Sequence, residues 1–84
     1  MKVTVRFFAG LREQLGTSGE EIELPGNVTT VGGLRSHLSE RGNAWQSALS
    51  GKQVRVAVNQ DMAPPSAAIK AGDEVAFFPP VTGG

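Results

Sequence analysis

The sequence has 84 residues, a formal net charge of zero and no cysteine, which together predict one small domain. The lack of cysteine excludes disulfides, thiolate metal sites and thiol nucleophiles, and acidic and basic residues are mixed evenly, so we expect no binding to nucleic acid or to an anionic membrane. No segment reads as a signal peptide or a membrane span, and we therefore expect a cytoplasmic protein that binds other proteins or a small molecule.

The first part of the chain predicts two strands joined by a short helix. Apolar and polar residues alternate over residues 2–7 and 20–24, which is the period of a half-buried strand. Between these runs Leu11 and Leu15 are four residues apart and Gly16 follows, so a helix is expected to end at this glycine. The two strands are expected to pair antiparallel.

The next segment predicts the main helix. Its buried face is expected to consist of three apolar residues at helical spacing: Val31, Leu34 and Leu38. Thr29 or Thr30 can cap its start, and Gly42 is expected to end it. Gly32 and Gly33 each cost roughly 1 kcal/mol relative to alanine in a helix, so either this end of the helix approaches the sheet closely or the helix starts late, and of the two we expect the close approach.

A further short helix and two strands are predicted in the second half of the chain. Asn43 is expected to cap a turn that packs Trp45 and Leu49 against the core. Alternating valines over residues 54–58 predict a third strand, and the proline-containing loop after it leaves room for a short edge strand at most. A last strand is predicted over residues 74–78.

This last strand has two faces. Val75 and Phe77 are expected in the core, which places Phe78 on the opposite face. Phe8 directly follows the first strand, and an aromatic residue at such a junction is expected in the core. The alternative is an exposed patch that Phe8 forms together with Phe78.

The order of these elements indicates an α+β fold. A mixed sheet of four to five strands would pack on one main helix, with the first and last strands central and parallel, because parallel pairing needs a helical crossover. This is the β-grasp, or ubiquitin-like, architecture. We expect residues 1–78 to form the β-grasp domain and residues 79–84 to form an extended C-terminal tail.

The tail ends in a free carboxylate on two glycines. Pro79 and Pro80 fix φ near −65° and offer no N–H, so they are expected to end the last strand and to project the chain outward. Gly83 and Gly84 can pass through a narrow slot, and an acyl group activated at Gly84 has no stereocentre to racemise. A frayed terminus is the alternative, but frayed tails are usually polar. The Gly84 carboxylate is therefore the candidate reactive group.

The apolar arm in front of the glycines is expected to bind a partner. Its two prolines lower the ordering cost of insertion, which is roughly 1–2 kcal/mol for each flexible residue that becomes fixed. We predict that Phe78, Pro79, Pro80 and Val81 pack on partner proteins, while Thr82 and the terminal glycines enter the partner's active site.

The other ionisable residues indicate no catalytic or metal site. His37 stands alone and is expected at the surface rather than at a metal. Asp73 and Glu74 are adjacent on a strand and point to opposite faces, so Asp73 is expected to form a turn instead of a catalytic pair. Arg12 is expected on a helix surface, where it can contact a partner.

Three segments carry a resemblance to a known family. They are Phe7-Phe8-Ala9-x-Leu11-Arg12-Glu13-x-x-Gly16, Ala57-Val58-Asn59, and the C-terminal run that begins at Gly72 and contains Phe-Phe-Pro-Pro-Val-Thr-Gly-Gly. Over nearly its whole length the chain resembles the small subunits of molybdopterin synthases, which are ubiquitin-like sulfur carriers. Other carriers and modifiers of this fold share the final Gly-Gly but usually lack the Phe-Pro-Pro-Val arm.

The resemblance implies a sulfur carrier that binds no cofactor itself and is not catalytic alone. An ATP-dependent activating enzyme would adenylate the Gly84 carboxylate, and a persulfide-bearing donor protein would supply the sulfur of a thiocarboxylate. The tail would then insert into the large synthase subunit, within a heterotetramer, and deliver sulfur to cyclic pyranopterin monophosphate in molybdenum cofactor biosynthesis. Phe8 and Arg12 are further candidate contacts.

Two other functions remain open from the sequence. A ubiquitin-like protein modifier, or a carrier for thiamine or tRNA thiolation, would use the same activation of Gly84 with a different acceptor. A plain interaction module with an inert tail is the third reading.

Overall fold

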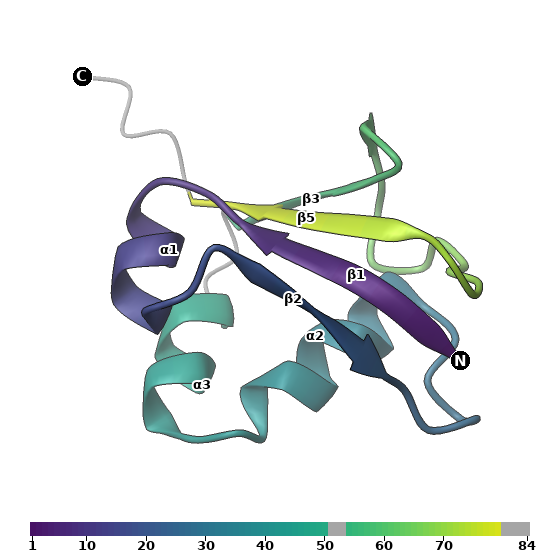
Figure 1. Cartoon of the computed structure of the whole chain (residues 1–84), viewed down its shortest axis with the longest axis horizontal. Coiled ribbons are helices and arrows are strands. Elements are labelled where there is room, and N and C mark those ends of the chain that lie inside the picture. The colour runs from purple at the N-terminus through teal and green to yellow at the C-terminus, as the bar shows by residue number, and fades with distance from the viewer. Residues whose placement is uncertain (51–53, 80–84) are drawn as a thin grey trace.

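The computed structural model describes residues 1–50 and 54–79 (Figure 1). Within these ranges, five strands and three helices follow one another as β1 (Lys2–Phe7), α1 (Gly10–Leu15), β2 (Gly19–Glu23), α2 (Val31–Ser39), α3 (Asn43–Leu49), β3 (Arg55–Val58), β4 (Asp61–Met62) and β5 (Glu74–Phe78). The strand order in the sheet is β2-β1-β5-β3-β4. β1 and β5 are parallel and central, and the other pairs are antiparallel, so the predicted β-grasp architecture is confirmed.

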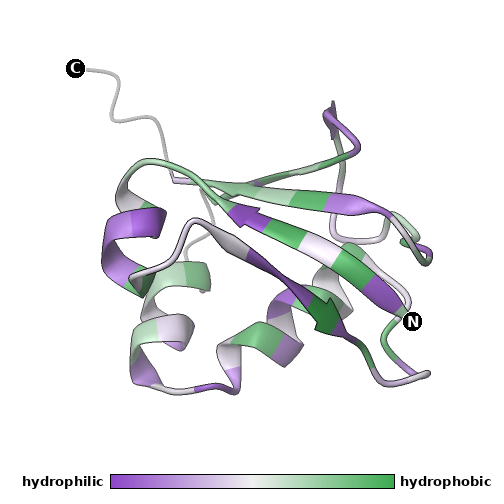
Figure 2. Cartoon of the chain, in the orientation of Figure 1, coloured by the Kyte–Doolittle hydropathy of each residue, from purple (hydrophilic) through white to green (hydrophobic). Residues whose placement is uncertain are grey.

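The core lies between the sheet and the helices, which cover one face of the sheet (Figure 1). Every second residue of the two central strands is fully buried there: Val3, Val5, Phe7, Val75 and Phe77. Figure 2 shows the matching alternation of hydrophobic and hydrophilic residues along β1. Burial of each such side chain stabilises the fold by about 1.5–3 kcal/mol, which holds β1 and β5 firmly side by side.

The ends of helices α1 and α2 agree in part with the predicted caps. Gly16 ends α1 in the left-handed conformation, with φ 74°, and its N–H donates to the Arg12 carbonyl. Thr30 caps α2, because its Oγ1 accepts the Gly33 N–H at 3.1 Å. The expected end of α2 at Gly42 is wrong, since the helix ends at Ser39.

The start of α3 also differs from the prediction. Asn43 is the first residue of the helix and does not cap it; Gly42 holds the cap position with φ 155° and no side-chain hydrogen bond. The Gly42 carbonyl accepts the Gln46 N–H at 2.9 Å. The glycine therefore redirects the chain between α2 and α3, and the backbone conformation it supplies matters more there than a side-chain acceptor.

The close approach expected at the glycines of α2 exists, but its partner is different. The Gly32 N–H donates to the Pro65 carbonyl at 2.8 Å, and a Cβ on Gly32 would lie 3.2 Å from the same oxygen. The neighbouring Val31 N–H donates to the Ala67 carbonyl at 3.0 Å. The loop after β4, and not the sheet, thus packs across the start of α2 and satisfies its free N–H groups.

The hairpin between β3 and β4 places the short edge strand earlier than expected. Asn59 and Gln60 both have positive φ, at 51° and 74°, and they connect Val58 to Asp61 in a two-residue turn. Such turns match the right-handed twist of the flanking strands. The edge strand therefore begins immediately after the turn, at Asp61.

Candidate docking site on the outer face of the sheet

The outer face of the sheet, which is turned away from the helices, carries two stacked phenylalanines. The rings of Phe8 and Phe78 have centroids 4.9 Å apart and planes inclined by 5°. Phe8 is 40% exposed, so its expected place in the core is wrong and the alternative patch with Phe78 is correct. The reason is the alternation of β1: Phe7 occupies the buried position, and the parallel register of Phe7 with Phe77 sets the two following residues side by side.

A row of apolar residues continues this surface across the sheet. Ala76 pairs with Ala57, and Ala57 pairs with Met62 on β4; paired residues point to the same face. Met62 is 58% exposed. We call the outer-face row of Phe8, Phe78, Ala76, Ala57 and Met62 the apolar patch; Phe8, Phe78 and Met62 supply its accessible area, because Ala76 and Ala57 are buried, with 7% and 3% exposed. Sequence reasoning missed Met62, although two turn-forming residues between two alternating runs could have predicted the hairpin that exposes it.

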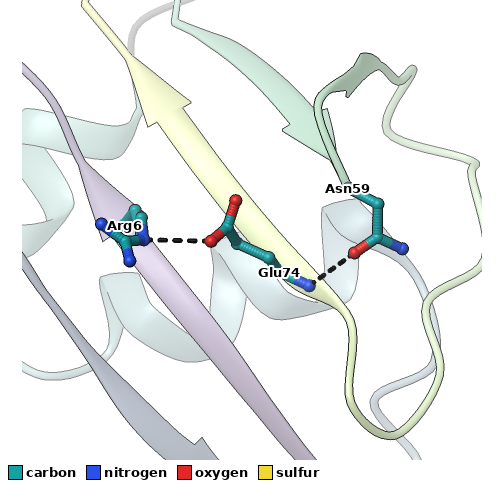
Figure 3. A network of polar contacts seen from close by, with 3 residues as sticks. All are labelled: Arg6, Asn59 and Glu74. Carbon is teal, nitrogen blue, oxygen red and sulfur yellow. Dashed lines mark hydrogen bonds and ion pairs between the residues drawn. The ribbon is translucent and has the colours of Figure 1, made fainter.

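Two basic residues lie on the outer face beside the apolar patch, and a third is exposed on α1. Arg6 pairs with Ala76 and Arg55 pairs with Phe78, so both lie on the outer face, and Arg12 is exposed on α1. Arg6 Nε donates to Glu74 Oε2 at 3.0 Å (Figure 3). Arg12 and Arg55 form no ion pair with any residue in the described part of the chain. The rim therefore favours a partner that offers carboxylates.

The start of β5 is held by a second polar network. The Glu74 N–H donates to Asn59 Oδ1 at 3.0 Å (Figure 3), and Asn59 Nδ2 donates to Asp73 Oδ1 at 3.0 Å. Asp73 Oδ2 also accepts the Lys70 N–H at 2.9 Å, which is the turn-forming role expected for this residue. These bonds fix the start of the strand whose other end carries Phe78.

Asp73 is ionised more readily than an ordinary aspartate. Its side chain is buried, with 6% of the residue exposed, yet its pKa is lowered. The hydrogen bond from the Asn59 amide is the main cause, and the Lys70 N–H adds to it, while burial opposes both. The folded structure therefore favours the charged form of Asp73.

Most of the predicted reactive tail lies outside the described residues. This applies to Pro80, Val81, Thr82, Gly83 and Gly84. Pro79, the last described residue, is half-buried and follows β5 directly. Of the predicted contacts, the structure thus brings Phe8 and Phe78 together and leaves Arg12 exposed on the helix after Phe8.

The other sequence predictions concern metal ligands, membrane spans, Trp45 and His37. Within residues 1–50 and 54–79, no three His, Cys, Asp or Glu side chains gather as metal ligands, and no helix is long and apolar enough to cross a membrane. Trp45 has the structural role expected for it, because its ring meets Phe7 edge-on with centroids 5.5 Å apart. His37 is half-buried on α2 rather than fully exposed.

The chain is similar to known proteins over nearly its whole length. Residues 5–84 match the ThiS family. The molybdopterin synthase sulfur carrier subunit of Haemophilus influenzae is 44% identical, over 98% of this chain and 99% of its own. Small archaeal modifier protein 1 of Haloferax volcanii is 30% identical with a TM-score of 0.79, over 95% of this chain and 98% of that structure. A chain in the complex of subunits 1 and 2 of the molybdopterin-converting factor of Helicobacter pylori is 25% identical with a TM-score of 0.70, and both chains are covered completely.

Proposed function

This chain belongs to the ThiS family, and on that premise we propose that it is the sulfur carrier subunit of a molybdopterin synthase. The observation that carries the proposal is the stack of Phe8 on Phe78, with centroids 4.9 Å apart, on an exposed face at the end of β5. Exposed aromatic pairs are typical of protein interfaces. This pair stands directly before the Pro-Pro-Val-Thr-Gly-Gly tail, so a partner that covers it is positioned to receive the tail.

The terminal carboxylate of Gly84 is the proposed reactive group. A carboxylate resists nucleophilic attack, so an activating enzyme first joins it to the AMP part of ATP and releases pyrophosphate. Persulfide sulfur of a donor protein then displaces AMP, and cleavage of the S–S bond by a second thiol leaves a thiocarboxylate. This anion is a softer and stronger nucleophile than a carboxylate, and it does at the terminus what cysteine does elsewhere.

The chain supplies no acid or base for these steps. Beyond Glu74 no side chain of the sequence is ionisable, so proton transfer and oxyanion stabilisation must come from the enzymes that receive the tail. We infer that the carrier binds no cofactor and is not catalytic alone. The activity belongs to the synthase complex, in which sulfur passes from the thiocarboxylate to cyclic pyranopterin monophosphate.

Three partners follow from this function. They are the synthase large subunit, the ATP-dependent activating enzyme and the persulfide-bearing sulfur donor, all proposed to meet the carrier in the cytoplasm. Phe78, Pro79, Pro80 and Val81 are proposed to dock the arm, and Thr82 to Gly84 to enter the active site. Two carriers bound to a large-subunit dimer would form a heterotetramer.

Reconstitution tests the proposal. The chain is chemically converted to the Gly84 thiocarboxylate and mixed with the large subunit and cyclic pyranopterin monophosphate, and molybdopterin formation is measured. We expect synthesis from the thiocarboxylate and none from the unmodified chain. A chain without Gly84 should fold and still bind the large subunit but support no synthesis; synthesis by this truncated chain would contradict the proposal.

A protein modifier is the second candidate, because the chain shares its fold and 30% of its residues with small archaeal modifier protein 1 of Haloferax volcanii. A modifier would join Gly84 to lysine amines of other proteins after the same activation. Intact mass of the protein isolated from cells separates the functions. Replacement of one oxygen by sulfur supports the carrier, and conjugates of high mass support the modifier.

A further inference from the structure

A small apolar pocket lies at the edge of the sheet beside the apolar patch. It is a recess of about 170 Å³ between the first turns of α2 and strand β3, and residues at and after β4 close it. We call it the edge pocket. Apart from Arg35 and Arg55, its lining residues carry no charged or hydrogen-bonding side chain. An engineered cavity of about 150 Å³ binds benzene, so the edge pocket has room for one apolar side chain and not for a nucleotide.

Backbone hydrogen bonds hold the walls of the edge pocket in place. The Ala63 N–H donates to the Val56 carbonyl at 2.9 Å, which ties one wall to β3. The Gly32 N–H donates to the Pro65 carbonyl at 2.8 Å, which ties the same loop to α2. The pocket is therefore formed before any partner binds, and a ligand need not open it.

The edge pocket is continuous with the apolar patch. Met62 belongs to both, and Arg55 lines the pocket while it pairs with Phe78 on the outer face. A protein that covers Phe78 and Met62 thus also lies over residues that line the pocket. This continuity points to one partner for both surfaces.

The charge of the residues that line the edge pocket indicates which group of a partner would lie beside an apolar side chain in the pocket. Arg35 and Arg55 are the ionisable residues of the lining, and both are cationic. Arg35 Nε donates to the Leu49 carbonyl, which holds that side chain against α3, whereas Arg55 is exposed and makes no ion pair within the described ranges. A carboxylate next to the inserted side chain would meet Arg55.

From these observations, and resting on the proposed function, we propose that the edge pocket binds an apolar side chain of the synthase large subunit. The segment that carries this side chain also presents a carboxylate to Arg55. The edge pocket is then a second anchor, separate from the active site that receives Gly84, and it fixes how the carrier is oriented while the tail inserts.

Two substitutions in the full-length chain test the second anchor. Ala63→Leu fills the edge pocket with the chain's own atoms, and Arg55→Glu reverses the charge at its mouth. Each should weaken binding of the purified large subunit, measured by isothermal titration calorimetry, by about tenfold or more, because an apolar group stays outside or a carboxylate is repelled.

Matched controls separate an effect at the edge pocket from a general effect of a larger side chain or of a reversed charge. Ala44→Leu makes the same change at an exposed position of α3, and Lys70→Glu makes the same charge change in the loop before β5. Both controls should bind the large subunit within about twofold of the original chain. Circular dichroism and thermal unfolding establish that each variant is folded, and Ala63→Val, which adds a smaller side chain to the edge pocket, keeps the test valid if Ala63→Leu does not fold.

A Phe78→Ala variant distinguishes failure of this inference from failure of the proposed function. If Phe78→Ala weakens binding while the two pocket variants match their controls, the second anchor is overturned and the proposed docking stands. If the original chain does not bind the large subunit at all, both are overturned. If the pocket variants weaken binding to the activating enzyme only, the large subunit is the wrong occupant.

Discussion

The side chain of Asn59 binds two consecutive residues, Asp73 and Glu74, which lie 14 and 15 positions later in the chain. Its amide nitrogen donates to the Asp73 carboxylate and its amide oxygen accepts the Glu74 N–H, both at 3.0 Å. The residue also adopts φ 51°, a conformation that asparagine tolerates better than most residues. One side chain therefore connects the β3–β4 turn to the start of the strand that leads to the tail.

We predict that Asn59→Ala lowers the free energy of unfolding by about 1–3 kcal/mol, because a buried carboxylate and a backbone N–H each lose a partner. Urea denaturation measures the loss. Asn59→Gly is the matched control, since it also removes both bonds but accepts positive φ. It should be more stable than the alanine variant by up to about 1 kcal/mol; equal stabilities would show that the backbone conformation contributes little.

Asp73 should make the fold sensitive to acid. Its pKa is lowered in the folded protein, so the folded state holds fewer protons than the unfolded state near the ordinary value of 3.8. The stabilisation is present above that value and is lost as the pH falls through the lower pKa of the folded state. The stability difference between the original chain and Asp73→Asn should therefore shrink as the pH is lowered below about 4.

Denaturation at a series of pH values checks this expectation. The pKa of Glu23 is also lowered, chiefly by its hydrogen bond to the amino terminus, so Glu23→Gln serves as the background in which Asp73→Asn is compared. A stability difference that stays constant across the acid range would contradict the assignment to Asp73.

Adjacent phenylalanines on β5 should separate folding from binding. Phe77 is fully buried, so Phe77→Ala should destabilise the fold by about 3–5 kcal/mol. Phe78→Ala removes a partly exposed ring and should cost about 1 kcal/mol of stability, but should weaken binding of the large subunit by about 2 kcal/mol or more. Thermal unfolding and calorimetry measure the two effects. A Phe78→Ala chain that unfolds, with unchanged affinity where folded, would assign Phe78 to the core.

The central part of this fold could be predicted from the sequence because its patterns are long and its side chains are buried. Alternation over β1 and β5 and helical spacing over α2 set the sheet, the parallel pair and the core. The expected outward position of Phe78 followed from the same alternation. Local chemistry at these residues and tertiary packing favour the same structure.

The errors arose where a contact between distant segments decides the local structure. Gly32 has a low helix propensity, and only the close approach of the Pro65 carbonyl explains why a glycine stands at this position. Phe8 reads as core, because an aromatic residue is usually buried; its exposure depends on the register that sets it beside Phe78. Met62 is part of the apolar patch only because the tight turn before it pairs β4 with β3. Sequence patterns describe periodicity well, but they do not give the register between strands.

Gly19 lies where the backbone of the neighbouring strand β1 leaves no room for a side chain. A Cβ there would come 2.3 Å from the Val5 carbonyl oxygen, and the residue has φ 149°. We predict that Gly19→Ala destabilises the fold by about 2 kcal/mol or more, because the edge strand must move away from β1. Gly10→Ala is the control, since a Cβ at Gly10 meets no atom within 4 Å. Urea denaturation should find that control within about 0.5 kcal/mol of the original chain, and equal effects of the two substitutions would contradict the predicted clash.

The basic rim of the apolar patch should speed the encounter with an acidic partner. Arg12 and Arg55 are exposed and unpaired within the described residues, so their field reaches into the solvent, but salt screens it beyond about 8–10 Å at 0.1–0.15 M ionic strength. The association rate constant with the large subunit, measured by stopped-flow fluorescence, should therefore fall as salt is added. Arg12→Gln and Arg55→Gln should each lower the rate at low salt and flatten its salt dependence. Lys70→Gln removes the same charge away from the patch and should change neither; an equal effect of all three variants would mean that net charge, and not the rim, governs the encounter.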